Sequence, residues 1–158
     1  MSYVESNLLK DESVVYKAGM HWVVFLWPII FSIFTVYARQ KNDAAMPLIG
    51  IFTLIIAIFL WVTSVVRYAT SEFAVTNKRV IAKAGSLDKQ SIEVLLQKVE
   101  GVRVNQSALG GLLGYGSVVI MGTGGSETPF HKIDNPQALR KAVQEQIATL
   151  EQAKVATA

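Results

Sequence analysis

Two long stretches of the chain contain no aspartate, glutamate, lysine or arginine, and both are strongly apolar. They cover residues 18–38 and 44–66, with centres that read VVFLWPIIFSIFTV and PLIGIFTLIIAIFLWVTSVV. A helix that crosses a bilayer needs about 20 apolar residues. Neither stretch has the polar stripe, repeating at helical period, that a surface helix of a soluble protein carries. The pattern therefore predicts two transmembrane helices, joined by a short extracytoplasmic loop at residues 39–43.

Lysine and arginine are unevenly distributed around these two stretches. The loop carries Arg39 and Lys41, whereas the other side carries Lys10, Lys17, Arg67, Lys78, Arg79 and Lys83. Because basic residues favour the cytoplasmic side, this bias predicts that a two-span protein has both termini in the cytoplasm. The lead-in, residues 1–17, is then cytoplasmic as well. No ionisable residue lies deep in either stretch, which favours an anchor over a transport pathway.

The remainder of the chain alternates between apolar and polar positions, as half-buried strands do. Short runs such as EFAVT and RVIAKA are separated by turn residues at 76–78, 85–88 and 123–126. Asn77 is suited to a left-handed turn position. A helix is expected to begin at Pro136, with Asn135 as its cap and an apolar stripe of Leu139, Val143, Ile147 and Leu150. Residues 68–153 are therefore predicted to form an antiparallel β domain closed by one amphipathic helix, followed by a tail at 154–158.

Seven of the eleven glycines lie in the run LGGLLGYGSVVIMGTGG, residues 109–125. A Walker-type phosphate loop needs Gly-Lys-Ser/Thr, and this run contains no lysine. We therefore expect the glycines to provide tight, positive-φ bends. These bends would return a short apolar turn, Leu109, Leu112 and Leu113, to the sheet as a core plug. An exposed apolar knob is the alternative.

Few residues have the character needed for catalysis or metal binding. The chain has two histidines, His21 and His131, and no cysteine. Metal sites need such ligands at close spacing, and nucleophilic catalysis needs a base beside its nucleophile. We expect a protein that is not an enzyme, with no cofactor, no metal and no catalytic residue. The net charge of +3 is too small to indicate nucleic-acid binding.

A series of short motifs resembles the bacterial pleckstrin-homology-like (PH-like) family of small membrane proteins. The motifs are EFAVTNKRVI at 72–81, LQKVEGVRVNQS at 96–107, LLGYGSVVI at 112–120 and GTGG at 122–125, preceded by LKDESVVY at 9–16 and then His21–Trp22. The resemblance covers nearly the whole chain and extends to the two apolar stretches. It implies an α+β fold, in which a two-helix transmembrane hairpin is followed by a partly open antiparallel barrel of about seven strands, capped by the C-terminal helix.

The same resemblance implies a binding role rather than chemistry, because this fold hosts many binding functions. Two hypotheses stay open. The first is a membrane-anchored binding or scaffolding module that binds an unidentified protein partner, or assembles into a homo-oligomer. The alternative is recognition of membrane lipids with anionic headgroups, or a transport-related role. In relatives by fold a basic loop between the first two strands holds headgroups, which makes Asn77, Lys78 and Arg79 the candidate lipid or partner contacts.

Overall fold

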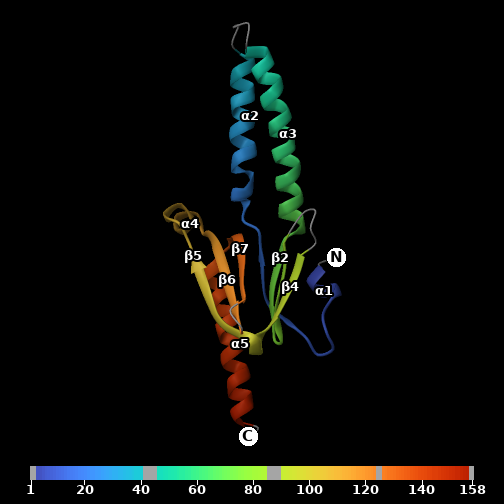
Figure 1. Ribbon diagram of the computed structural model, residues 1–158, viewed down its shortest axis with the longest axis vertical. Helices are drawn as coiled ribbons and strands as arrows, with labels where there is room; N and C mark the ends of the chain where they lie inside the picture. The colour runs from blue at the N-terminus through green and yellow to red at the C-terminus, as the bar shows by residue number, and fades with distance from the viewer. Residues whose placement is uncertain (1–2, 41–45, 85–89, 124–125, 157–158) are drawn as a thin grey trace. The chain divides into compact units, whose positions relative to one another are not determined.

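Two antiparallel sheets make up the larger of the two units into which the chain divides (Figure 1). The structure is a computed structural model, and it describes residues 3–40, 46–84, 90–123 and 126–156. One unit comprises Met1–His21 and Thr70–Ala158, and the other comprises Trp22–Ala69. The mixed α+β fold class expected from the sequence is confirmed in this form.

The first sheet draws its strands from both sides of the apolar stretches. Its order is β1 (Val14–Gly19), β2 (Glu72–Thr76), β3 (Arg79–Ala84) and β4 (Gln90–Leu95). The sequence reading placed residues 14–17 in a lead-in and residues 18–19 in the first span, which is wrong. The segment pairs with β2 as a strand because Tyr16 packs on the main core and Ala18 is buried in it, whereas Val14 packs against a separate apolar cluster.

The second sheet is a three-stranded meander. It consists of β5 (Val99–Asn105), β6 (Tyr115–Gly122) and β7 (Ser126–Asp134), in that order. A short 3₁₀ turn, η2 (Leu96–Lys98), joins β4 to β5, and its Leu96 side chain is buried. The turns predicted at 85–88 and around Gly124 and Gly125 lie outside the described residues.

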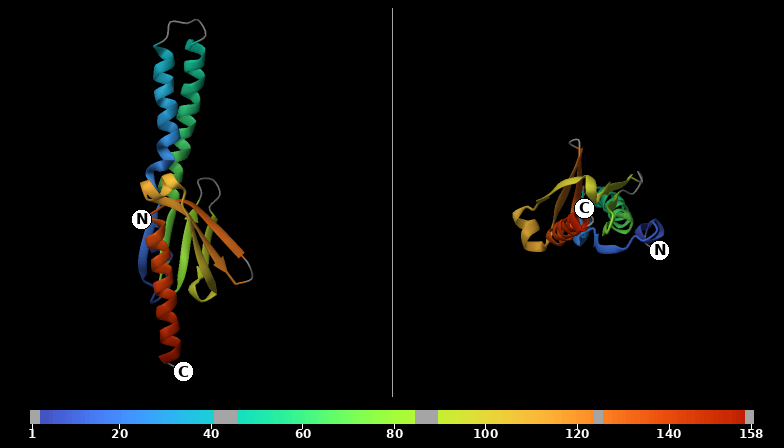
Figure 2. Two further views of the ribbon diagram at one scale, coloured as in Figure 1. Left: turned by 90° about the vertical axis from the view of Figure 1, so that its left-hand side faces the viewer. Right: turned by 90° about the horizontal axis from the view of Figure 1, so that it is seen from below.

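The C-terminal helix, α5 (Pro136–Ala156), begins at the predicted proline and contacts strands of both sheets (Figure 2). Its buried side chains are Leu139, Ala142 and Val143, and Ile147 and Leu150 pack at the edge of the same cluster. Phe73 of the first sheet and Phe130 of the second meet there edge to face, with ring centroids 5.4 Å apart. Both sheets and the helix therefore share one apolar core. The helix continues to Ala156, into the segment expected to be a tail.

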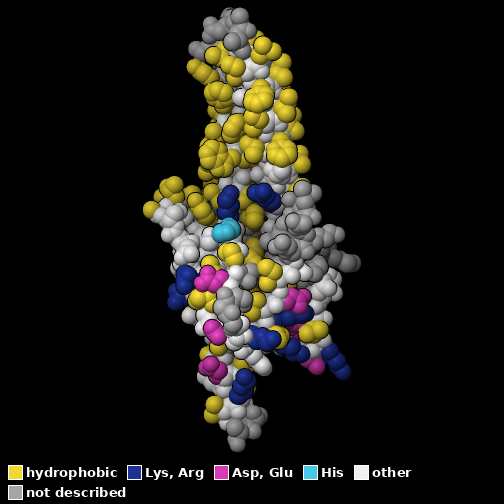
Figure 3. All heavy atoms as spheres, viewed as in Figure 1, with side chains coloured by type: hydrophobic (Ala, Val, Ile, Leu, Met, Phe, Trp, Pro, Cys, Tyr) yellow, Lys and Arg dark blue, Asp and Glu magenta, His cyan; other side chains and the backbone are white. Residues whose placement is uncertain are grey.

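The smaller unit contains a 3₁₀ turn, η1 (Trp22–Phe25), and the helices α2 (Leu26–Arg39) and α3 (Met46–Thr70). By length and composition, Trp22–Arg39 and Met46–Thr70 can each cross a membrane. We refer to α2 and α3 as the helix pair. Most of its large apolar side chains are exposed to the surroundings (Figure 3).

Hydroxyl and indole groups connect the two helices. Thr35 donates from Oγ1 to Oγ1 of Thr53 at 3.1 Å, and Trp61 donates from Nε1 to Oγ of Ser32 at 3.1 Å. Ser64 donates to the carbonyl of Val24, also at 3.1 Å. These polar groups are satisfied within the unit, and the surface left exposed is apolar, as a lipid environment requires.

Candidate functional site

The β2–β3 turn, residues 76–79, holds the candidate residues Asn77, Lys78 and Arg79. Arg79 begins β3, and only 7% of its surface is exposed. Its guanidinium is bidentate on the Glu12 carboxylate, from Nε to Oε1 and from Nη2 to Oε2, each at 2.9 Å. Nη2 also donates to the Asn7 carbonyl at 2.7 Å, and Nη1 pairs with Glu93. Arg79 therefore makes internal contacts with all three nitrogens of its guanidinium, and its contact with a lipid headgroup or a partner stays a prediction.

Glu12 is the buried anion of this cluster. Besides Arg79 it accepts hydrogen bonds from the Thr76 hydroxyl at 2.8 Å and from the Leu9 backbone N–H at 2.7 Å. Burial by itself raises the pKa of the Glu12 carboxyl, but these hydrogen bonds outweigh it and hold the pKa below its ordinary value. The Arg79 pKa is raised, chiefly by its hydrogen bond with Glu12. Both groups are therefore charged at neutral pH.

Asn77 and Lys78 bind the N-terminal segment as well. The Asn77 side chain donates to the Asp11 carbonyl at 3.1 Å and accepts from the Ser13 N–H at 3.0 Å. The Lys78 ammonium donates to the Lys10 carbonyl at 2.7 Å, although its side chain is exposed. Asn77 does not have the positive φ expected from the sequence. Its hydrogen-bond partner Asp11 has a positive φ instead, of 61°.

The segment held by this turn covers the outer face of the first sheet. Val4, in the short helix α1 (Tyr3–Ser6), packs with Leu8 against Ala74 and Ile81. Residues 3–13 therefore contribute an apolar patch and a buried ion pair to the domain. Sequence analysis missed Glu12, Glu93 and Thr76, because no local pattern pairs residues that lie up to 67 positions apart. The only local indication of this ion pair was the presence of an acidic residue, Glu12, in the N-terminal lead-in.

The leucines of the glycine-rich run lie on a short helix, α4 (Ala108–Leu113). Leu109, Leu112 and Leu113 are 64%, 82% and 38% exposed. The prediction that these leucines fill part of the core is wrong. The structure shows the alternative, in which they form an exposed apolar surface. The residues form a helical turn because Ser107 caps its start and Gly114, at φ of 81°, ends it.

A hollow of about 350 Å³ follows the edge of the first sheet at β4. Its lining includes four consecutive residues of that strand, 92–95, together with Lys98, Gly122 and Thr123. Within the described residues β4 pairs with β3 alone, so its other edge has no strand beside it. An unpaired edge presents backbone N–H and C=O groups to which an extended chain can bind.

The two histidines occupy different environments. His131 is exposed on β7, with Nδ1 3.0 Å from the Ser117 hydroxyl. His21 is buried, with its ring 5.3 Å from that of Tyr115 and its Nε2 3.9 Å from an Asp134 carboxylate oxygen. In the described ranges, no group of three or more metal-ligating side chains is assembled.

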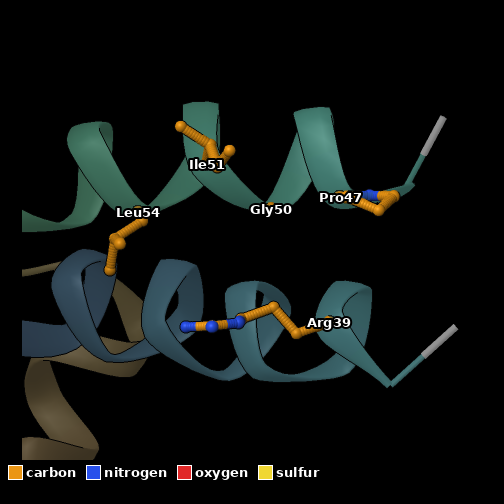
Figure 4. A pocket seen from close by; sticks show the side chains of 5 residues that line it. All are labelled: Arg39, Pro47, Gly50, Ile51 and Leu54. Carbon is orange, nitrogen blue, oxygen red and sulfur yellow. The ribbon is translucent and has the colours of Figure 1, made fainter.

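A hollow of about 290 Å³ lies in the helix pair and is lined by Arg39, Pro47, Gly50, Ile51 and Leu54 (Figure 4). A Cβ atom on Gly50 would lie 3.3 Å from Cγ of Arg39, so the absence of a side chain leaves room for the arginine stem. An arginine near a helix end can lie with its stem against apolar surface and extend its charge to the membrane interface. This hollow therefore fits a structural role.

The two sheets, the shared core and α5 define a PH-like domain, and the two apolar helices are inserted in the chain between its strands β1 and β2. The family model described as Bacterial PH domain matches residues 18–147, and the chain belongs to this family. The resemblance noted in the sequence is thereby confirmed. A comparison with proteins of curated function finds no match.

Proposed function

We propose that this protein is a non-catalytic binding module anchored in the bacterial inner membrane by its helix pair. Both termini and the PH-like domain lie in the cytoplasm, in line with the distribution of lysine and arginine. The domain binds an extended segment of a protein partner along β4. The observation that supports this proposal is the hollow beside an unpaired strand edge.

The chemistry of the hollow indicates what the partner segment contains. Ile92, Val94 and Leu95 supply apolar surface and Lys98 supplies a cation, while the Glu93 carboxylate in the same lining is paired with Arg79. In β-strand addition the backbone ladder contributes affinity, and pockets for alternate side chains contribute specificity. The expected segment is therefore extended, has apolar side chains at alternate positions and carries an acidic residue that meets Lys98. An equivalent segment from a second copy would turn the same site into a self-assembly contact.

The alternative functions have less support. A cation near an anionic membrane surface contributes about 1 kcal/mol to membrane binding. Because Arg79 is paired internally, Lys78 is the one cation that the β2–β3 turn presents for such binding. The hydroxyl groups of Ser32, Thr35, Thr53 and Ser64 form hydrogen bonds within the smaller unit, which suits an anchor better than a pathway. The unpaired edge of β4, by contrast, suits β-strand addition.

The test uses the full chain in lipid nanodiscs and a displayed library of random peptides. Selected peptides are expected to protect the β4 amides from hydrogen exchange. Leu95→Lys is expected to weaken their binding at least about tenfold, or about 1.4 kcal/mol, because it places a charge in the apolar hollow. The matched control is Val155→Lys, at an exposed apolar residue of α5.

Protection elsewhere, for example between β5 and α5, would contradict the proposal that β4 is the binding edge. Equal loss of binding in both variants would contradict it too. Protection of β4 that appears without peptide as the protein concentration rises would show that the edge binds a second copy.

A further inference from the structure

The short helix α4 is built to hold its leucines outward. The Ser107 hydroxyl accepts from the Gly110 N–H at 3.1 Å, and the Gly111 N–H donates to the Ser107 carbonyl at 2.8 Å. A Cβ atom on Gly110 would lie 2.6 Å from the carbonyl oxygen of Tyr115, so this side of the helix is packed closely against the start of β6. The leucines at 109, 112 and 113 are spaced i, i+3 and i+4 and therefore share one face of the helix, which is exposed. Their exposure therefore comes from a defined structure.

Contacts within the domain place the end of α4 close along the chain to a residue that packs on His21, the last residue of this unit before the first apolar helix. Tyr115, two residues after α4, packs against His21 and pairs with Asp134 across β6 and β7. The His21 N–H donates to the Lys132 carbonyl at 2.8 Å. His21 directly precedes Trp22, the first residue of η1.

The length of the first apolar segment determines where His21 lies relative to a bilayer. The four residues of η1 and the fourteen of α2 have a combined rise of about 29 Å. The hydrocarbon core is about 30 Å thick. The segment spans it only if Trp22 lies at the hydrocarbon edge, which puts His21 and Tyr115 in the headgroup layer. Two residues of chain, at most about 7 Å, separate Tyr115 from the last leucine of α4.

The composition around α4 suits a lipid surface. Residues 104–126 contain no aspartate, glutamate, lysine or arginine, so bringing α4 into the interface desolvates no formal charge. Figure 3 shows apolar side chains gathered over this helix. Three leucines on six residues offer little area beside the about 800 Å² that each partner buries in a standard protein interface. An apolar helix face need enter only the outer 5 to 10 Å or so of a membrane to bind it.

We propose that α4 is a second membrane contact. Leu109, Leu112 and Leu113 insert into the headgroup layer of the same bilayer that holds the helix pair, and so restrict the orientation of the domain. This inference rests on the proposed membrane anchoring, and it assigns a lipid-binding role to a part of the domain distinct from the β2–β3 turn and from β4.

The experiment exploits the absence of cysteine from the chain. Single-cysteine variants Leu112→Cys, Val155→Cys and Phe59→Cys are labelled with an environment-sensitive fluorophore. The full-length protein is placed in vesicles of phosphatidylethanolamine and phosphatidylglycerol with nitroxide-labelled phosphatidylcholine. Val155, 79% exposed on α5, is the matched control. Phe59, exposed on α3, reports the anchor itself.

Insertion of α4 predicts a blue-shifted emission at position 112 and quenching by lipid nitroxide several-fold stronger than at position 155. Equal and weak quenching at 112 and 155, with strong quenching at 59, would overturn the inference and leave the anchor intact. A label at 112 that is shielded from aqueous iodide but not quenched by lipid would overturn it in favour of a protein contact. Absence of lipid quenching at position 59 would contradict both the proposed membrane anchoring by the helix pair and this inference.

Discussion

The β2–β3 turn is polar and α4 is apolar, yet the arginine of the turn is buried and the leucines of α4 are exposed. The turn reads Thr-Asn-Lys-Arg, yet its arginine is buried and paired with two carboxylates. The helix α4 reads Ala-Leu-Gly-Gly-Leu-Leu, yet its leucines are exposed. A charged residue is usually outside and a leucine usually inside. Here both tendencies are reversed.

The difference lies in which other segment reaches each site. Residues 3–13 lie over the turn and supply Glu12, so the Arg79 charge is buried together with its counter-charge. Over the leucines of α4 no comparable segment lies within the described chain, since all three remain exposed. The burial of a residue is thus decided by distant parts of the chain as much as by its own type. Three changes, taken from the largest expected effect to the smallest, test this contrast.

The largest effect is expected from Arg79→Ala. It leaves the Glu12 carboxylate buried without its cation, and breaking a buried pair in this way costs about 3 to 5 kcal/mol. The free energy of unfolding of the domain, measured by denaturant titration of the full chain in nanodiscs, should fall by that amount. Lys78→Ala is the matched control at the neighbouring exposed cation and should change it by less than about 0.5 kcal/mol. Similar losses in the two variants would show that the ion pair does not hold the N-terminal segment in place.

A smaller effect is expected from pH, through Glu12. Its pKa in the folded protein is below the ordinary value of 4.5. The stabilisation that it contributes is therefore fully present above that value and is lost as the pH falls through the lower folded pKa. Melting temperatures of the native protein and of Glu12→Gln should differ at neutral pH and converge in acid. A constant difference across this range would contradict the assignment of Glu12 as the buried anion.

The smallest effects are expected at α4. Ser107→Ala removes the cap of the helix and should cost about 1 kcal/mol. Leu112→Ser removes only exposed surface and should stay within about 0.5 kcal/mol. Thermal unfolding of the two variants measures both changes in stability. A loss of several kcal/mol in Leu112→Ser would mean that the side chain is buried after all.

Sequence patterns were sufficient wherever a structure depends on neighbours along the chain. The apolar stretches predicted α2 and α3, although α2 begins later than expected and α3 continues to Thr70. The apolar stripe of the C-terminal segment, together with Pro136 at its start, predicted α5. The alternation of apolar and polar residues predicted the strands after residue 70. The strand Val14–Gly19 has no clear alternation in its sequence, and its last two residues continue into an uncharged stretch, so it was assigned in part to the span.

The sequence by itself determined the two apolar helices, the β domain and its family, because length, period and composition are local properties. Only the tertiary structure decided that β1 joins β2 across the apolar helices, that Arg79 is buried and that α4 is exposed. These outcomes depend on contacts between residues far apart in the chain. Glu12 and Arg79 are separated by 67 positions, and the local sequence of the turn gives no indication that a carboxylate from the N-terminal segment neutralises its arginine.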